Sequence, residues 1–131
     1  PLPQTALEVG AGTGRITRVL QDLRVQVLPT EPSQAMIDEY PSKTGLPSVV
    51  KLSGEEIRPW IGTFDCVVGL RVLWHIKDRA RRREILSRAA SRATKWLVFD
   101  FANAKRYKNP VLYPLFRIYG LLFNKNFYRS D

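Results

Sequence analysis

The apolar residues of this chain fall into short runs, separated by segments in which they recur every three or four positions. Five runs predict strands, at residues 4–9, 25–28, 48–52, 64–70 and 95–101. The last run is continuous enough to predict an interior strand. Helical spacing follows the first run, where the apolar positions are Ile16, Val19, Leu20 and Leu23. A second helix is predicted over residues 78–93, after the fourth run. Strands that alternate with helices predict an α/β fold with a parallel sheet.

A glycine-rich turn joins the first predicted strand to the first helix. Residues 7–14 read Leu-Glu-Val-Gly-Ala-Gly-Thr-Gly, with glycines on alternate positions. Glycine lets the backbone approach a ligand closely, and the following helix presents free N–H groups, so the turn predicts a nucleotide-binding unit. A dinucleotide fingerprint would place its third glycine at position 15, which is Arg15 here. A tight turn that binds nothing is the remaining alternative.

Two acids accompany this turn. Glu8 precedes Gly10 by two residues, and Glu31 follows the second strand, 21 residues after Gly10. An acid at that distance suits a ribose, because a carboxylate can accept hydrogen bonds from both ribose hydroxyls. The alternative for Glu31 is a solvent-exposed acid at the start of a helix.

Residues 7–101 resemble the core of the class I S-adenosylmethionine-dependent methyltransferases, with the motifs of that family in order. The resemblance rests on residues 7–14, on Glu-Pro-Ser-Gln-Ala-Met at 31–36 and on Phe-Asp-Cys-Val-Val-Gly-Leu at 64–70. It implies an α/β, doubly wound, Rossmann-like sheet with helices on both faces. We expect about five parallel strands in this sequence and expect the final strand pair of the family to be missing. We therefore expect the chain to be a fragment of a longer protein.

The same resemblance implies S-adenosylmethionine as the cofactor and methyl transfer to a small-molecule or lipid-like acceptor as the reaction. The residues that it places in cofactor binding are Glu8, Gly10, Ala11, Gly12, Gly14, Glu31, Pro32, Met36, Ser53, Gly54, Glu55 and Leu70. Ser53 departs from the family pattern, which usually carries an acid there to bind the adenine amino group. Either Glu55 or a backbone amide is expected to take over that contact.

The segment after the fourth strand bears on the methyl acceptor. A nucleic-acid amino methyltransferase would be expected to carry an acid or asparagine followed by Pro-Pro-aromatic, whereas residues 69–72 read Gly-Leu-Arg-Val. Nucleic acid is therefore not expected as a partner. His75 is the only histidine, and an imidazole that titrates near neutral pH suits a general base. A histidine that merely completes a loop is the alternative, and no metal is expected.

Charge is distributed unevenly along the chain. The 131 residues carry 21 basic and 12 acidic side chains, a net charge of +9. Residues 1–70 hold 6 basic and 8 acidic side chains (−2), and residues 71–131 hold 15 basic and 4 acidic ones (+11). The alternative function is therefore a non-catalytic methyltransferase-fold module that binds an anionic partner through its basic C-terminal half. Arg81, Arg88 and Arg92 align in one stripe of their helix, which we expect to be solvated.

We expect a single domain over residues 1–131, with its core at about 4–101 and a lid-like or substrate-region segment at 102–131. That last segment is apolar with basic margins, so peripheral membrane contact is an alternative to a lid. Cys66 is the only cysteine and lies in an apolar run, which predicts a buried thiol in a reducing, cytoplasmic compartment. Asp65 is expected to form structural bonds at the start of the fourth strand.

Overall fold

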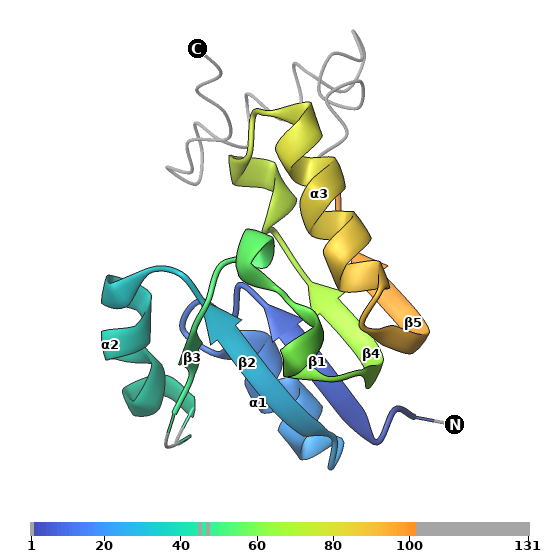
Figure 1. Ribbon diagram of the computed structural model, residues 1–131. Coiled ribbons are helices and arrows are strands. Elements are labelled where there is room, and N and C mark those ends of the chain that lie inside the picture. The colour runs from blue at the N-terminus through green and yellow to red at the C-terminus, as the bar shows by residue number, and fades with distance from the viewer. Residues whose placement is uncertain (1, 45, 47, 102–131) are drawn as a thin grey trace, which may run out of the picture. The chain divides into compact units, whose positions relative to one another are not determined.

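The computed structural model describes residues 2–44, 46 and 48–101, which form one parallel sheet with helices on both faces (Figure 1). The strands are β1 (Thr5–Val9), β2 (Gln26–Glu31), β3 (Val50–Lys51), β4 (Phe64–Gly69) and β5 (Ala93–Phe99). Their order is β3-β2-β1-β4-β5, so the chain winds outward from β1 to β3 and then returns to the other side of β1. This order confirms the predicted doubly wound sheet. The expected lid or membrane-contact segment at 102–131 lies outside the described residues.

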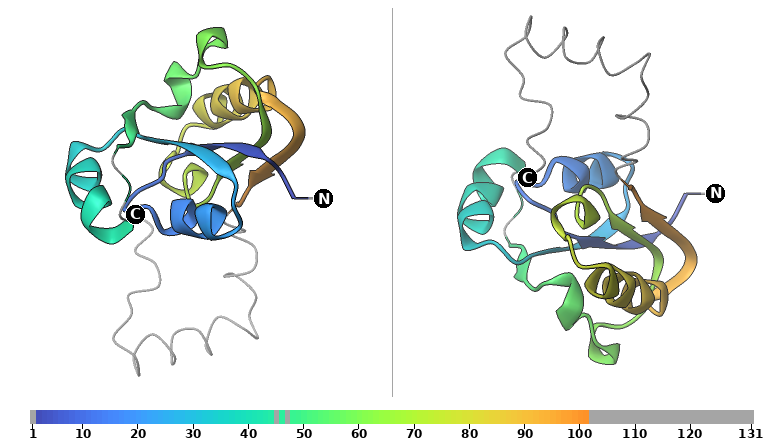
Figure 2. Two further views of the ribbon diagram at one scale, coloured as in Figure 1. Left: turned by 90° about the horizontal axis from the view of Figure 1, so that it is seen from below. Right: turned by 90° about the horizontal axis from the view of Figure 1, so that it is seen from above.

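Three α-helices and three short 3-10 helices connect the strands. They are α1 (Arg15–Asp22), α2 (Gln34–Thr44), η1 (Gly54–Glu56), η2 (Pro59–Ile61), η3 (Leu73–His75) and α3 (Arg79–Ala90). Views along two opposite directions show α1 and α3 on opposite faces of the sheet (Figure 2). α2 lies beside α1, whereas α3 packs against η1 and β5.

The core forms on both faces of the sheet because side chains alternate along β1. Leu7 and Val9 point to one face, where they pack with Val67 of β4 and Ala89 of α3. Ala6 points to the other face. Its cluster there contains Val25, Cys66 and Val68, with Ile16 and Leu20 of α1 packed against it. The Cys66 thiol is buried as predicted, and burial raises its pKa.

Two aspartates fix the ends of elements around the sheet. Asp65 accepts hydrogen bonds from the backbone N–H groups of Gln4 (2.8 Å) and Thr5 (3.4 Å) and pairs with Lys95, so its predicted structural role is confirmed. Asp78 begins α3 as an N-cap, since its carboxylate accepts from the N–H of Ala80 at 2.7 Å.

Two boundaries differ from the prediction. α3 ends at Ala90 and not at Ala93, because a turn at Ser91 and Arg92 redirects the chain into β5. β2 continues through Pro29 to Glu31. Proline has no backbone N–H, but Pro29 pairs with β1 alone, because β3 pairs only with the last two residues of β2.

The fifth strand was predicted to be interior, and this is wrong for the described sheet. β5 lies at its edge, next to β4 alone. The side chains of Trp96, Leu97 and Val98 are accordingly 38–44% exposed.

Candidate active-site cleft

The glycine turn after β1 adopts a conformation that only glycine accepts easily. The φ angles of Gly10, Gly12 and Gly14 are 69°, 59° and 83°, all in the left-handed region. Two backbone N–H groups of the turn reach the end of β2. The N–H of Ala11 donates to the carbonyl oxygen of Thr30 at 2.8 Å, and that of Gly12 donates to Oε2 of Glu31 at 2.7 Å. The turn is therefore held open over the carboxyl end of the sheet.

The structure also leaves too little space for a side chain at Gly10. A Cβ atom at this position would lie 2.6 Å from Cγ2 of Val72, which belongs to the segment after β4. A Cβ on Gly12 would meet nothing within 4 Å. The loop after β4 thus closes over the first glycine, whereas the second glycine faces open space.

Glu8 is a buried carboxylate beneath the turn. Only 3% of its surface is exposed, and Oε2 accepts a hydrogen bond from the Thr17 hydroxyl at 2.5 Å. Burial raises the pKa of Glu8, the Thr17 hydrogen bond acts in the opposite direction, and the nearby charge of Glu31 adds to the increase. A cation bound in the cleft would stabilise the ionised form of this group.

Glu31 is similarly enclosed, with 7% of its surface exposed. Its two oxygens accept from two backbone N–H groups, Oε2 from Gly12 and Oε1 from Ser33 at 2.9 Å. This geometry rules out the alternative of a solvent-exposed acid. Each carboxylate oxygen can accept more than one hydrogen bond, so both retain capacity for a ligand hydroxyl.

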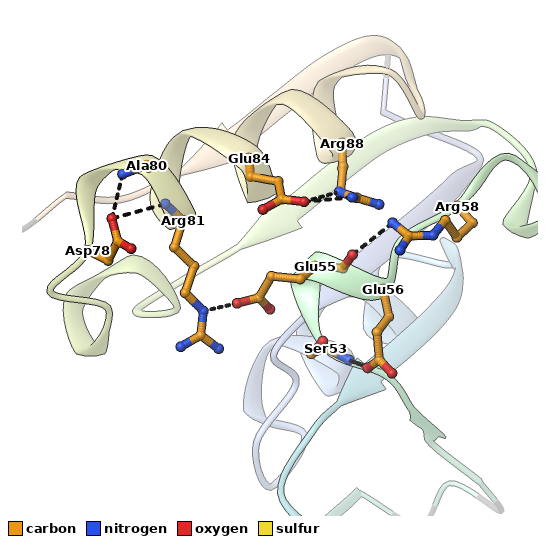
Figure 3. Close-up of polar contacts among 9 residues, drawn as sticks. All are labelled: Ser53, Glu55, Glu56, Arg58, Asp78, Ala80, Arg81, Glu84 and Arg88. Atoms are coloured by element: carbon orange, nitrogen blue, oxygen red, sulfur yellow. Dashed lines mark hydrogen bonds and ion pairs between the residues drawn. The ribbon is translucent and has the colours of Figure 1, made fainter.

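The segment after β3 forms another wall of the cleft, and its polar contacts with α3 are drawn in Figure 3. The Glu55 carboxylate pairs with the Arg81 guanidinium of α3. Partial burial alone would raise the pKa of Glu55, but the Arg81 hydrogen bond and charge lower it overall. The N–H of Ser53 donates to Oε2 of Glu56 at 2.8 Å. Glu55, one candidate for the adenine contact, is therefore engaged with α3.

The arginines at positions 81, 88 and 92 are exposed or partly exposed, as expected for a solvated stripe, but each of them also bonds within the domain. Arg81 pairs with Glu55, and Arg88 donates to the carbonyl oxygen of Ile57 at 3.3 Å. Arg92 donates to the carbonyl oxygen of Pro59 at 3.4 Å. The stripe faces the backbone between β3 and β4 because α3 packs directly against η1.

These elements enclose a cleft of about 670 Å³, within the size range of small-ligand sites. The predicted site residues that line it are Glu8, Gly10, Ala11, Gly12, Glu31, Pro32, Met36, Ser53, Gly54, Glu55, Leu70 and His75. Gly14 is not among the lining residues. It lies buried at the start of α1, where its N–H donates to the carbonyl oxygen of Ala11.

Sequence reasoning missed several residues of the wall. Val72 lies two residues after Leu70, so its place just beyond the end of a parallel strand was the signal that could have identified it. Arg81 and Ile85 come from α3. Their spacing is that of any amphipathic helix, and it carries no signal for a ligand site.

A protein-family model described as "Methyltransferase domain" matches residues 7–95, well over half of the chain. The chain belongs to this methyltransferase family. Among curated proteins, none matches the chain in sequence. S-adenosylmethionine is the cofactor of the family, in agreement with the resemblance seen in the glycine turn.

Solved structures share the fold. Magnesium protoporphyrin IX methyltransferase (ChlM) from Synechocystis PCC 6803 with bound SAM has a TM-score of 0.67 and 22% identity, over 80% of this chain and 51% of that one. A TehB-like SAM-dependent methyltransferase from Corynebacterium glutamicum ATCC 13032 has a TM-score of 0.67 and 20% identity, over 79% and 58%. The glycopeptide N-methyltransferase MtfA complexed with SAM has a TM-score of 0.62 and 21% identity, over 75% and 47%. The chain spans about half the length of these relatives.

Two further findings concern membrane-spanning segments and the candidate base. Among the described helices, none combines the length and apolar character needed to span a membrane. His75, the candidate base, ends η3 and lies exposed at the cleft wall.

Proposed function

We propose that this chain binds S-adenosylmethionine in the cleft at the end of β1 and contributes to methyl transfer to a small-molecule acceptor. The observation that carries the proposal is the pair of buried carboxylates, Glu8 and Glu31, beside a glycine turn. The methyl donor is a cation with a ribose and an amino group. Two enclosed carboxylates favour such a ligand and repel the pyrophosphate of a dinucleotide.

Each residue of the cleft would have a separate part in binding. The open space at Gly12 would admit the amino-acid end of the cofactor, with the Glu8 charge close by to attract its cationic groups. Glu31 would accept from the ribose hydroxyls while it keeps the N–H of Gly12 in place. Pro32 and Met36 would flank the adenosine, and Leu70 would lie below it at the sheet edge.

The adenine contact needs a different arrangement from the one usual in the family. Glu55 is held by Arg81, and Ser53 has no carboxylate. Ser53 and Gly54 still line the cleft. Their backbone is therefore the part of this wall that we assign to the adenine edge.

Chemistry at the site would depend mainly on positioning. The cofactor supplies an activated methyl group when it is bound. The chain would hold the acceptor in line with that group, which can account for several kcal/mol of barrier reduction. His75 would take up a proton only where the acceptor atom must lose one, and its exposed position at the cleft wall leaves it open to a small acceptor.

The alternative of a non-catalytic module with a basic surface is less well supported. Arg81, Arg88 and Arg92 each make contacts within the domain, which engage part of their hydrogen-bonding capacity. The basic residues beyond position 101 lie outside the described residues. The cleft therefore favours an enzyme that methylates a small molecule.

Calorimetric titration tests the proposal. S-adenosylmethionine should bind the chain with one site, and Gly12→Asp should abolish that binding because its side chain would fill the open space assigned to the amino-acid end of the cofactor. Gly62→Asp is the control, since Gly62 also has a positive φ and open space at its Cβ position but does not line the cleft. Absence of heat with S-adenosylmethionine on folded protein, together with saturable binding of NAD, would overturn the assignment.

A further inference from the structure

Arg71 has an unusual backbone for a residue of its size. Its φ angle is 64°, in the left-handed region that disfavours L side chains. Arg24 has a similar φ of 60°, but there the cause is evident. Arg24 follows the last turn of α1, and its N–H donates back to the carbonyl oxygen of Gln21 at 2.7 Å, as helix ends commonly require. Arg71 follows a strand and has no such explanation.

A carboxylate that directly follows the neighbouring strand holds Arg71 in this conformation. The N–H of Arg71 donates to Oδ1 of Asp100, just after β5, at 2.5 Å. On its other side, Val72 packs over Gly10 of the glycine turn. Arg71 is thus fixed from both sides at the point where β1 and β4 end. Strained residues that the surrounding structure holds in place are concentrated at functional sites.

The guanidinium of Arg71 is available to a ligand. Its Cζ atom lies 5.7 Å from the centre of the Trp74 ring, within the range of a cation–π contact. Among the described residues, no carboxylate forms an ion pair with it, although Arg81, Arg88 and Lys95 all have such partners. The side chain is exposed and lines the cleft. A planar guanidinium beside an aromatic ring is well suited to bind a carboxylate or phosphate with two hydrogen bonds.

The buried acids and Arg71 lie at different strand ends of the cleft. Glu8 and Glu31 belong to β1 and β2, and Arg71 follows β4, while Arg15 of α1 and the Glu55–Arg81 pair also line the cleft. From this separation, together with the held and unpaired Arg71, we propose that the methyl acceptor carries an anionic group, a carboxylate or a phosphate, that binds the Arg71 guanidinium. Trp74 positions that guanidinium. The inference rests on the proposed function, because it assigns the other half of the same cleft to the acceptor.

Binding of simple anions tests this subsite. The chain is first saturated with S-adenosylhomocysteine and then titrated with benzoate, phenyl phosphate and neutral benzamide. At least one anion should bind about tenfold more tightly than benzamide, as expected for charge-assisted hydrogen bonds. Arg71→Gln should remove this preference, and Arg71→Lys should retain part of it. Arg24→Gln is the matched control, with the same substitution at a left-handed arginine outside the cleft, and should retain all of it.

A second variant separates ligand binding from a structural role. Arg71→Gly relieves the backbone strain, so its thermal midpoint should rise by about 2–6 °C while the anion preference disappears. A fall in midpoint would mean that the Trp74 contact serves stability, and it would overturn the proposal. Equal binding of anions and benzamide to the unmodified chain would overturn it as well. Because the first titration reports S-adenosylhomocysteine binding by itself, a failure of the proposed function is seen before any anion is added.

Discussion

The Glu31 carboxylate accepts a hydrogen bond from the N–H of Gly12 at 2.7 Å and thereby joins the end of β2 to the glycine turn after β1. The same carboxylate accepts from the N–H of Ser33, where the chain enters α2. One side chain thus organises the two strand ends that face the cleft. Its role in shaping the apo site and its proposed role toward the ribose are coupled.

Replacement of Glu31 should therefore affect both stability and cofactor binding. Glu31→Ala leaves two N–H groups without their acceptor, and we expect a loss of about 1–3 kcal/mol in the free energy of unfolding. The affinity for S-adenosylmethionine should fall about 10–100-fold, since hydrogen bonds to a charged group are lost. Urea denaturation and calorimetry measure the two effects. Glu84→Ala removes an exposed acid outside the cleft and should change neither by more than about 0.5 kcal/mol. Wild-type affinity in Glu31→Ala would exclude the ribose role.

Gly10 and Val72 provide a test of the close approach between the turn and the loop after β4. Gly10→Ala adds a methyl group 2.6 Å from Cγ2 of Val72 and also places alanine at a φ of 69°. The combined cost should be about 2–5 kcal/mol of unfolding free energy. Val72→Ala in the same chain removes the clash and should restore about half of the loss, since the backbone strain remains. Additive effects in a double-mutant cycle by urea denaturation would show that the two residues do not interact.

Much of the fold followed from local patterns in the sequence. The apolar runs predicted the five strands and a parallel sheet, and the resemblance of residues 7–101 to a known family implied that the sheet is doubly wound. The edge position of β5 was missed. Apolar side chains at Trp96, Leu97 and Val98 are equally consistent with an interior strand, and only the sheet order distinguishes the two.

The sequence likewise predicted some features of the candidate site and not others. Glu8 and Glu31 were predictable because their distance from a glycine turn fixes where they lie. The Arg81–Glu55 pair and the Arg71–Asp100 bond were not, since each joins residues 26 or 29 positions apart on different elements. Such contacts depend on how α3 and β5 pack, and no local spacing encodes that.

Glu8 should make the stability of the apo chain depend on pH. Its pKa is raised by burial, so its contribution to stability is complete below the unfolded value of about 4.5 and is lost as pH rises through the folded pKa. Glu8→Gln stays neutral and can keep the Thr17 hydrogen bond. Its thermal midpoint should match wild type at acidic pH and exceed it by about 2–6 °C at pH 7. Glu84→Gln, at an exposed site, serves as the control. Parallel midpoints of Glu8→Gln and wild type at every pH would contradict the burial effect.

The same substitution should have the opposite effect on the ligand. A cationic cofactor favours ionised Glu8, so the affinity of the wild-type chain for S-adenosylmethionine should rise with pH. In Glu8→Gln the affinity should be lower, and it should lose the part of its pH dependence that comes from Glu8. Calorimetry at several pH values measures this slope. A variant that is more stable yet binds more weakly would show that Glu8 is retained for the ligand and not for the fold.

The Glu55–Arg81 pair should contribute little to stability, although it closes one wall of the cleft. The Arg81 side chain is 57% exposed, and an ion pair in such surroundings is screened by solvent and salt. A double-mutant cycle with Glu55→Gln and Arg81→Gln should give a coupling free energy below about 1 kcal/mol, smaller still in 1 M salt. Because its pKa is lowered, the Glu55 contribution should be present above its unfolded value and disappear as pH falls through the folded one. Arg88→Gln, which also removes an ion pair with Glu84 and a hydrogen bond to the Ile57 carbonyl, should cost more in unfolding free energy than Arg81→Gln. A coupling well above 1 kcal/mol that persists in high salt would mean that Arg81 fixes the adenine wall as a structural element.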